Sequence, residues 1–123
     1  MRQRPNFAAV AFLLSACVAL PSKSMAIGAL AISHNASGMS GDWPTAAVAQ
    51  AHAMHACQSH GDGTCRVVAT FQNQCVAVSA GATTGEFWTL ASSLAAAQQR
   101  VMAKCHAAHQ SGCHLVDSGC DPR

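Results

Sequence analysis

The sequence predicts an α+β fold, in which a small disulfide-stabilised domain is built from two pseudo-repeated β-hairpin–helix–strand units with a mainly antiparallel sheet. The first observation is an internal repeat: 48 residues separate Cys57 from Cys105, and the same interval separates Cys65 from Cys113. The second is the presence of six cysteines within residues 27–123. In so short a stretch, an even set of cysteines is typical of a disulfide framework.

The first 26 residues predict a cleaved export signal. Arg2 and Arg4 precede an uncharged, mostly apolar segment at 7–20, and small residues after it place the cleavage between Ala26 and Ile27. The apolar segment is shorter than the roughly 20 residues that a membrane-spanning helix needs. We therefore expect a single domain at 27–123 with no transmembrane helix in the mature protein.

A second processing site lies inside the same apolar segment. The sequence Leu14-Ser-Ala-Cys17 resembles a bacterial lipobox, in which the cysteine is lipidated and becomes the new N-terminus. We expect a periplasmic or secreted protein, with a lipid anchor on Cys17 as the alternative. Both routes place the domain outside the cytoplasm, where disulfides persist.

The first unit covers about residues 28–74. It contains two short apolar segments around turn-forming residues, then an alanine-rich stretch that Thr45 can cap, then a β-branched segment. The expected elements are strands at 28–33 and 39–43, a helix at 46–59 and a strand at 65–71.

The second unit, about residues 75–120, repeats this plan. The expected elements are strands at 75–79 and 86–89, a helix from Ser92 or Ser93 to about Ala108, and a strand at 113–117. The interval from Trp88 to Cys105 is 17 residues, against 14 from Trp43 to Cys57. We expect the two tryptophans to match, and the second helix therefore to be about three residues longer. In both helices the cysteine shares a stripe with a methionine three residues earlier, and we expect that stripe to face the sheet.

The repeat also bears on the disulfides. Spacing alone leaves fifteen pairings open for six cysteines. The repeat favours two bonds that each tie a helix end to the next strand, and a third bond that joins the two units. The expected pairs are Cys57–Cys65, Cys105–Cys113 and Cys75–Cys120.

Several segments carry a family resemblance. They are Gly28-Ala-Leu-Ala-Ile-Ser33, the alanine-rich helices ending at Cys57 and Cys105, the run Cys65-Arg-Val-Val-Ala-Thr-Phe-Gln-Asn-Gln-Cys75, and the closing stretch from Cys113 to Cys120. In this order they resemble the Domain of Unknown Function 4189 (DUF4189) family of bacterial exported proteins, over essentially 28–120. The resemblance implies no catalytic residues.

The charge of the chain argues against nucleic-acid binding. The whole sequence has a net charge of +2, but residues 27–123 contain four basic and five acidic side chains, for a net charge of −1. No basic patch remains that could neutralise a phosphate backbone.

The sequence also lacks signs of catalysis. It contains no Gly-x-Ser-x-Gly elbow and no recognisable pair of catalytic carboxylates. We therefore expect a non-enzymatic protein-interaction module without a cofactor, whose partner is unknown. Inhibition of a secreted toxin or cell-wall enzyme, as by an immunity protein, is one form of this function. Contact with a host or competitor protein is another.

One candidate contact surface is aromatic. Trp43 and Trp88 are expected to end matching strands, and Met39 on the first hairpin could join them in an exposed patch. Core packing at the junction of hairpin and helix is the competing interpretation, and we favour it.

A cluster of histidines supports an alternative function. His52 and His55 lie three residues apart on one side of the first helix, and His60 follows near its end. Neutral imidazoles at this spacing suit zinc, copper or nickel, as in a periplasmic metal-binding protein. Exposed histidines on a solvated helix face are the simpler explanation.

Overall fold

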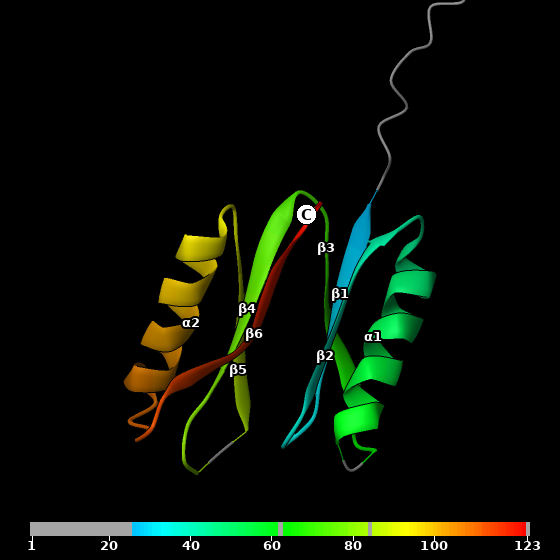
Figure 1. Cartoon of the computed structure of the whole chain (residues 1–123). Coiled ribbons are helices and arrows are strands. Elements are labelled where there is room, and N and C mark those ends of the chain that lie inside the picture. The colour runs from blue at the N-terminus through cyan, green and yellow to red at the C-terminus, as the bar shows by residue number, and fades with distance from the viewer. Residues whose placement is uncertain (1–25, 62, 84, 123) are drawn as a thin grey trace, which may run out of the picture.

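The fold is described by a computed structural model that covers residues 26–61, 63–83 and 85–122. Eight elements follow the order β-β-α-β twice, so the repeat of the cysteines is also a repeat of structure (Figure 1). Residues 1–25, which contain most of the expected export signal and Cys17, lie outside the described residues. Within the described part, no helix is long and apolar enough to cross a membrane.

The first unit forms a three-stranded antiparallel sheet with one helix. Its elements are β1 (Ile27–Ile32), β2 (Ser37–Trp43), α1 (Ala46–His60) and β3 (Arg66–Phe71). The strand order is β2-β1-β3. Thr45 caps α1, because its side-chain oxygen accepts a hydrogen bond from the Val48 amide at 3.3 Å. This bond satisfies one of the amide groups that the start of a helix leaves unpaired.

The second unit has the same architecture. Its elements are β4 (Gln74–Ala80), β5 (Glu86–Ala91), α2 (Leu94–Ala107) and β6 (His114–Asp121). The strand order is β5-β4-β6. Of the two expected caps, Ser93 is the one used, and its side-chain oxygen accepts from the Ala96 amide at 3.2 Å.

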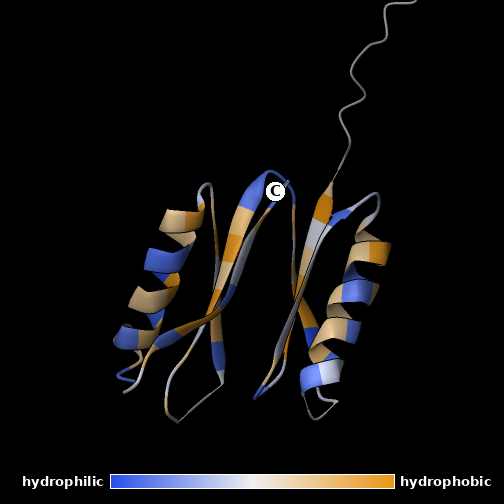
Figure 2. Cartoon of the chain, viewed as in Figure 1, coloured by the Kyte–Doolittle hydropathy of each residue, from blue (hydrophilic) through white to orange (hydrophobic). Residues whose placement is uncertain are grey.

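The two sheets pack face to face, and each helix covers the outer face of its own sheet (Figure 1). The expected antiparallel sheet is therefore divided into two. Large apolar side chains gather between the sheets, and apolar residues run along the central strands β1 and β4 (Figure 2). The buried members of this inter-sheet core are Leu30, Ile32, Phe71, Val76 and Val78.

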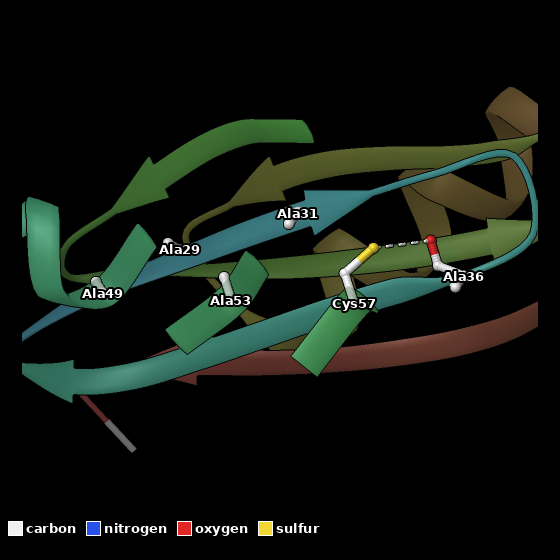
Figure 3. Close-up of a cluster of buried hydrophobic side chains, with 6 residues drawn as sticks. All are labelled: Ala29, Ala31, Ala36, Ala49, Ala53 and Cys57. Carbon is white, nitrogen blue, oxygen red and sulfur yellow. Dashed lines mark hydrogen bonds between the residues drawn. The ribbon is translucent and has the colours of Figure 1, made fainter. Parts of the chain in front are cut away.

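Small residues fill the layers between helix and sheet. Figure 3 shows the cluster under α1, which consists of Ala29, Ala31, Ala36, Ala49, Ala53 and Cys57. The Cys57 Sγ atom lies 3.7 Å from the Ala36 carbonyl oxygen, and this is a packing contact because a disulfide sulfur carries no proton. A Cβ at Gly38 would lie 2.1 Å from the Cys57 nitrogen. Only glycine at this position lets α1 approach β2 so closely.

Both helices bury the face that carries their cysteine, as expected. The buried positions are four residues apart: Ala49, Ala53 and Cys57 on α1, and Ala97, Val101 and Cys105 on α2. The methionines Met54 and Met102 pack at the edges of these clusters and are partly buried.

The pairing of β1 with β3 and the pairing of β4 with β6 are related by the same 48-residue interval. The register between β1 and β3 shifts at Leu30/Ala31, and the register between β4 and β6 shifts at Val78/Ser79, 48 residues later. The backbones of the two units can therefore be compared position by position.

The expected match of the two tryptophans is wrong. Trp43 lies opposite Ile27, and the equivalent pair in the second unit is Ala91 opposite Cys75. Trp43 ends its strand, but Trp88 lies in the middle of β5. The expected longer second helix is wrong for the same reason: α2 has 14 residues and α1 has 15, because the extra residues after Trp88 continue the strand.

The structure contains three disulfides, with the pairing that the repeat favours: Cys57–Cys65, Cys105–Cys113 and Cys75–Cys120. The first two tie the end of each helix to the segment before the next strand. The third differs from expectation. Cys75 and Cys120 are register partners on β4 and β6, so this bond lies within the second sheet and does not join the two units.

Candidate functional site

One end of the molecule gathers both hairpin turns and the C-terminal ends of both helices (Figure 1). Two neighbouring cavities open there, of about 400 Å³ and about 380 Å³. They share His34, Gly85 and Glu86 in their walls. We call this pair of cavities, defined by the three shared residues, the turn-end cleft.

The two cavities are related by the repeat. The smaller one is lined by first-unit residues that include Ile32 and Arg66, and the larger by second-unit residues that include Ala80 and His114. Ile32 corresponds to Ala80 at the 48-residue interval, and Arg66 corresponds to His114. Each unit thus builds most of one cavity, and His34, Gly85 and Glu86 contribute to both.

Glu86 is the chemically unusual residue of the cleft. It is the first residue of β5 and pairs with Ala80 in the sheet. Its Oε2 atom is buried and has no hydrogen-bond partner among the described residues. Burial raises the pKa of the Glu86 carboxyl group, the negative charge of Asp117 raises it further, and a hydrogen bond with Ser37 acts in the opposite direction. Since Ser37 begins β2, the Glu86 side chain lies close to the first sheet.

Hydrogen bonds hold the wall of the larger cavity in place. The Thr83 amide and hydroxyl donate to the Gln110 side-chain oxygen, at 3.1 and 2.6 Å. The Ala82 amide donates to the Ser111 carbonyl at 2.8 Å. The turn between β4 and β5 is therefore fixed to the segment between α2 and β6. His114 Nδ1 lies 2.9 Å from the Gly112 carbonyl oxygen. Because a carbonyl only accepts, this nitrogen is the donor.

Two large aliphatic side chains are exposed beside the cleft. Leu115 and Val116 follow His114 at the start of β6 and are 42% and 40% exposed. Val116 also lines the larger cavity. β6 is an edge strand, because it pairs with β4 on one side only, and edge strands present backbone groups to a partner.

The expected metal site is not assembled. His52 stacks on Trp43, with ring centroids 3.8 Å apart and an interplanar angle of 4°. His60 is the last residue of α1, so eight residues of helix, about 12 Å along the axis, separate it from His52. Within the residues that the structure describes, no group of three His, Cys, Asp or Glu side chains could hold a metal ion.

The candidate aromatic surface, which was the less favoured interpretation, is also divided. Met39 and Trp88 pack against the inter-sheet core, whereas Trp43 packs against the cluster under α1. These three side chains therefore lie on opposite faces of the sheets and form no common patch.

The opposite end of the molecule has a smaller polar site. Asp121 is 1% exposed, and its Oδ2 atom accepts a hydrogen bond from the Asp42 amide at 3.0 Å. Its Oδ1 atom has no hydrogen-bond partner in the described part of the chain. Asp121 and the Cys75–Cys120 disulfide line a cavity of about 370 Å³.

Sequence reasoning missed Glu86, His34 and His114. One signal was available: Glu86 is the only glutamate of the chain and the only charged residue between Arg66 and Arg100. A single charge within such an uncharged stretch marks a position where the fold needs or tolerates a carboxyl group. No local motif surrounds it.

A family model described as Domain of unknown function (DUF4189) matches residues 27–120. This range includes both units and all three disulfides. No curated protein and no solved structure matches the chain.

Proposed function

The chain belongs to the DUF4189 family, and we propose that it is an exported, disulfide-stabilised protein-binding module that contacts its partner with the turn-end surface. This surface consists of the turn-end cleft together with Leu115 and Val116. The observation that carries the proposal is the exposure of these two aliphatic side chains on an edge strand, directly beside a cleft. Exposed apolar side chains next to a polar hollow are typical of interaction sites.

The chemistry of the cleft supports binding more than turnover. Covalent catalysis needs a nucleophile in contact with a base. The Thr83 hydroxyl is directed to the Gln110 side chain, and the Nδ1 atom of His114 is directed to a backbone carbonyl. The Thr83 hydroxyl and the His114 imidazole are therefore not positioned to exchange a proton with each other. A binding surface, in contrast, needs only shape, apolar area and polar groups that remain available.

Export is supported by the disulfides and by the sequence. Disulfides persist in oxidising compartments outside the cytoplasm, and three of them crosslink this domain. The expected signal peptide supplies the route, with lipidation of Cys17 as the alternative to soluble release. The partner would then be a secreted toxin, a cell-wall enzyme, or a protein of a host or competitor.

The proposal is tested by affinity capture from an extracytoplasmic extract with quantitative mass spectrometry. The wild-type protein is compared with a Leu115→Asp/Val116→Asp variant. A Val48→Asp/Leu94→Asp variant is the matched control, since these two side chains are 38% and 40% exposed on the helices. Disulfide mapping of each variant confirms the native pairing.

We expect a defined partner to bind the wild type and the helix variant but not the β6 variant. The partner is then purified, and its Kd for all three proteins is measured. Equal binding by the β6 variant, or the absence of a partner that distinguishes wild type from that variant, would overturn the proposal.

A further inference from the structure

We propose that the larger cavity of the turn-end cleft binds a cationic side chain, an arginine or lysine of the partner, against the carboxylate of Glu86. The inference rests on the proposed protein-binding function and names the chemistry of the partner at that surface. It follows from an unpaired carboxylate oxygen, from the contents of the two cavities, and from the charges around them.

The first observation is the unmet hydrogen-bonding capacity of Glu86. Its Oε2 atom is buried, and no group in the described part of the chain donates to it. Buried polar atoms are nearly always hydrogen-bonded, so an unpaired one requires an explanation. A guanidinium or ammonium group supplies donors together with the opposite charge, and such charge-assisted bonds are the strongest that a carboxylate forms.

The second observation is a difference between two equivalent positions. Arg66 lines the smaller cavity, so the chain itself contributes a cation to the wall of that cavity. At the equivalent position of the larger cavity stands His114, whose Nδ1 is occupied by the Gly112 carbonyl. The larger cavity therefore shares the carboxyl group, but none of the described residues in its wall is a permanent cation. Its volume of about 400 Å³ lies in the range of ordinary ligand pockets, so it has room for a long side chain.

The charges that face Glu86 agree with a cationic ligand. The carboxylate of Asp117 raises the pKa of Glu86, and a bound cation would lower it again. Among the described residues, the other ionisable groups in the cavity walls are His34, His114 and Arg66. As the pH falls, Glu86 takes up a proton and loses its negative charge. This change removes the attraction for a cation, so binding should weaken in acid.

The test is an NMR titration of the isotope-labelled, disulfide-bonded protein, produced by export from the full sequence. The probe is Nα-acetyl-arginine amide, and Nα-acetyl-citrulline amide is its neutral analogue of nearly the same shape. Glu86→Gln removes the proposed anchor. Asp42→Asn is the matched control, because it removes one acidic charge at the opposite end of β2.

We expect saturable shifts of the Gly85, Glu86 and His114 amide signals with the arginine probe at pH 7.5, and weaker binding at pH 5. The neutral analogue and the Glu86→Gln variant should bind roughly tenfold more weakly or worse, since a charged hydrogen bond is lost. The Asp42→Asn variant should bind as the wild type does. Equal binding of both probes, binding that survives Glu86→Gln, or no binding would each overturn the inference.

The result of this titration can be distinguished from the result of the partner-binding experiment that tests the proposed function. If the probe fails while Leu115→Asp/Val116→Asp still abolishes partner binding, the cation inference is wrong and the protein-binding function stands. If the probe binds through Glu86 but partner binding does not depend on Leu115 and Val116, the proposed function is wrong and the cleft is a site for small cations.

Discussion

The disulfide between Cys75 and Cys120 should contribute more to stability than either of the other two. It closes a loop with a sequence separation of 45, whereas the two helix-end disulfides each have a separation of 8. In the chain-entropy account, a crosslink stabilises the native state by restricting the unfolded chain. The effect grows with the logarithm of loop length.

The loop lengths give the magnitude. At 25 °C the relation yields about 4 kcal/mol for the long loop and about 2.5 kcal/mol for each short loop. The expected difference of about 1.5 kcal/mol corresponds to roughly 6–12 °C in Tm for a domain of this size. One cysteine of each pair is buried, namely Cys57, Cys75 and Cys105, so replacing any pair by alanine also removes a packed sulfur atom. This cost is common to the three variants, so the difference between them reports mainly the loop length.

The assay compares three variants, in each of which both cysteines of one pair are replaced by alanine. Guanidinium unfolding without reductant gives the free energy of unfolding, and mass spectrometry verifies the two remaining bonds. The two short-loop variants control for each other, because they lie at equivalent places in the repeat. The reasoning is refuted if the Cys75→Ala/Cys120→Ala variant is as stable as, or more stable than, both of them.

Four further outcomes are expected. The Glu86→Gln variant should be more stable than the wild type at pH 7, so that its unfolding midpoint lies at a higher urea concentration. This gain should vanish below the ordinary glutamate pKa of 4.5, because a raised native pKa makes stability fall as the pH rises through it. Gly38→Ala should lower the free energy of unfolding by about 1–3 kcal/mol through its clash with α1. Gly85→Ala, whose Cβ would point into open space, should stay within about 0.5 kcal/mol of wild type. Zinc should leave the Tm of wild type and of His52→Ala/His55→Ala equally unchanged, whereas stabilisation of the wild type alone would restore the metal hypothesis.

The sequence contains a signal for two separate sheets, although the number of predicted strands alone does not reveal it. Along β1, the run Gly28-Ala-Leu-Ala-Ile32 contains no polar residue, and every position in it is buried. Cys75 to Ser79 in β4 is buried in the same way. A strand in an antiparallel sheet with one solvated face alternates polar and apolar residues, whereas a continuous apolar run indicates cover on both faces. The two runs together predict two central strands, each between a helix and the other sheet.

The two tryptophans occupy positions that are not equivalent in the repeat. At the 48-residue interval Trp43 corresponds to Ala91, three residues after Trp88. The register between β2 and β1 shifts between Ile27 and Ala29, and Asp42 near the end of β2 has a positive φ of 64°. A bulge of this kind changes the count by one residue, so it does not account for a mismatch of three. Matching the units by their tryptophans therefore gives the wrong alignment.

The turn-end cleft could not be found from local motifs because it lies where the two repeats meet. Ser37 and Glu86 occupy equivalent positions, as the first residues of β2 and β5, and Ser37 is one of the groups that set the pKa of the Glu86 carboxyl group. Met39 and Trp88 likewise pair with the equivalent residues Leu30 and Val78, and all four side chains meet in the inter-sheet core.

When equivalent residues contact each other, the pseudo-twofold axis passes between them. In a symmetric dimer both residues at such a position would be the same, and two buried carboxyl groups there would repel each other. A single chain with two units can place Glu86 opposite Ser37, and Arg66 in one cavity opposite His114 in the other. A single carboxyl group shared by two cavities, of which one has an arginine in its wall and the other a histidine, is therefore an arrangement that requires the two repeats to differ.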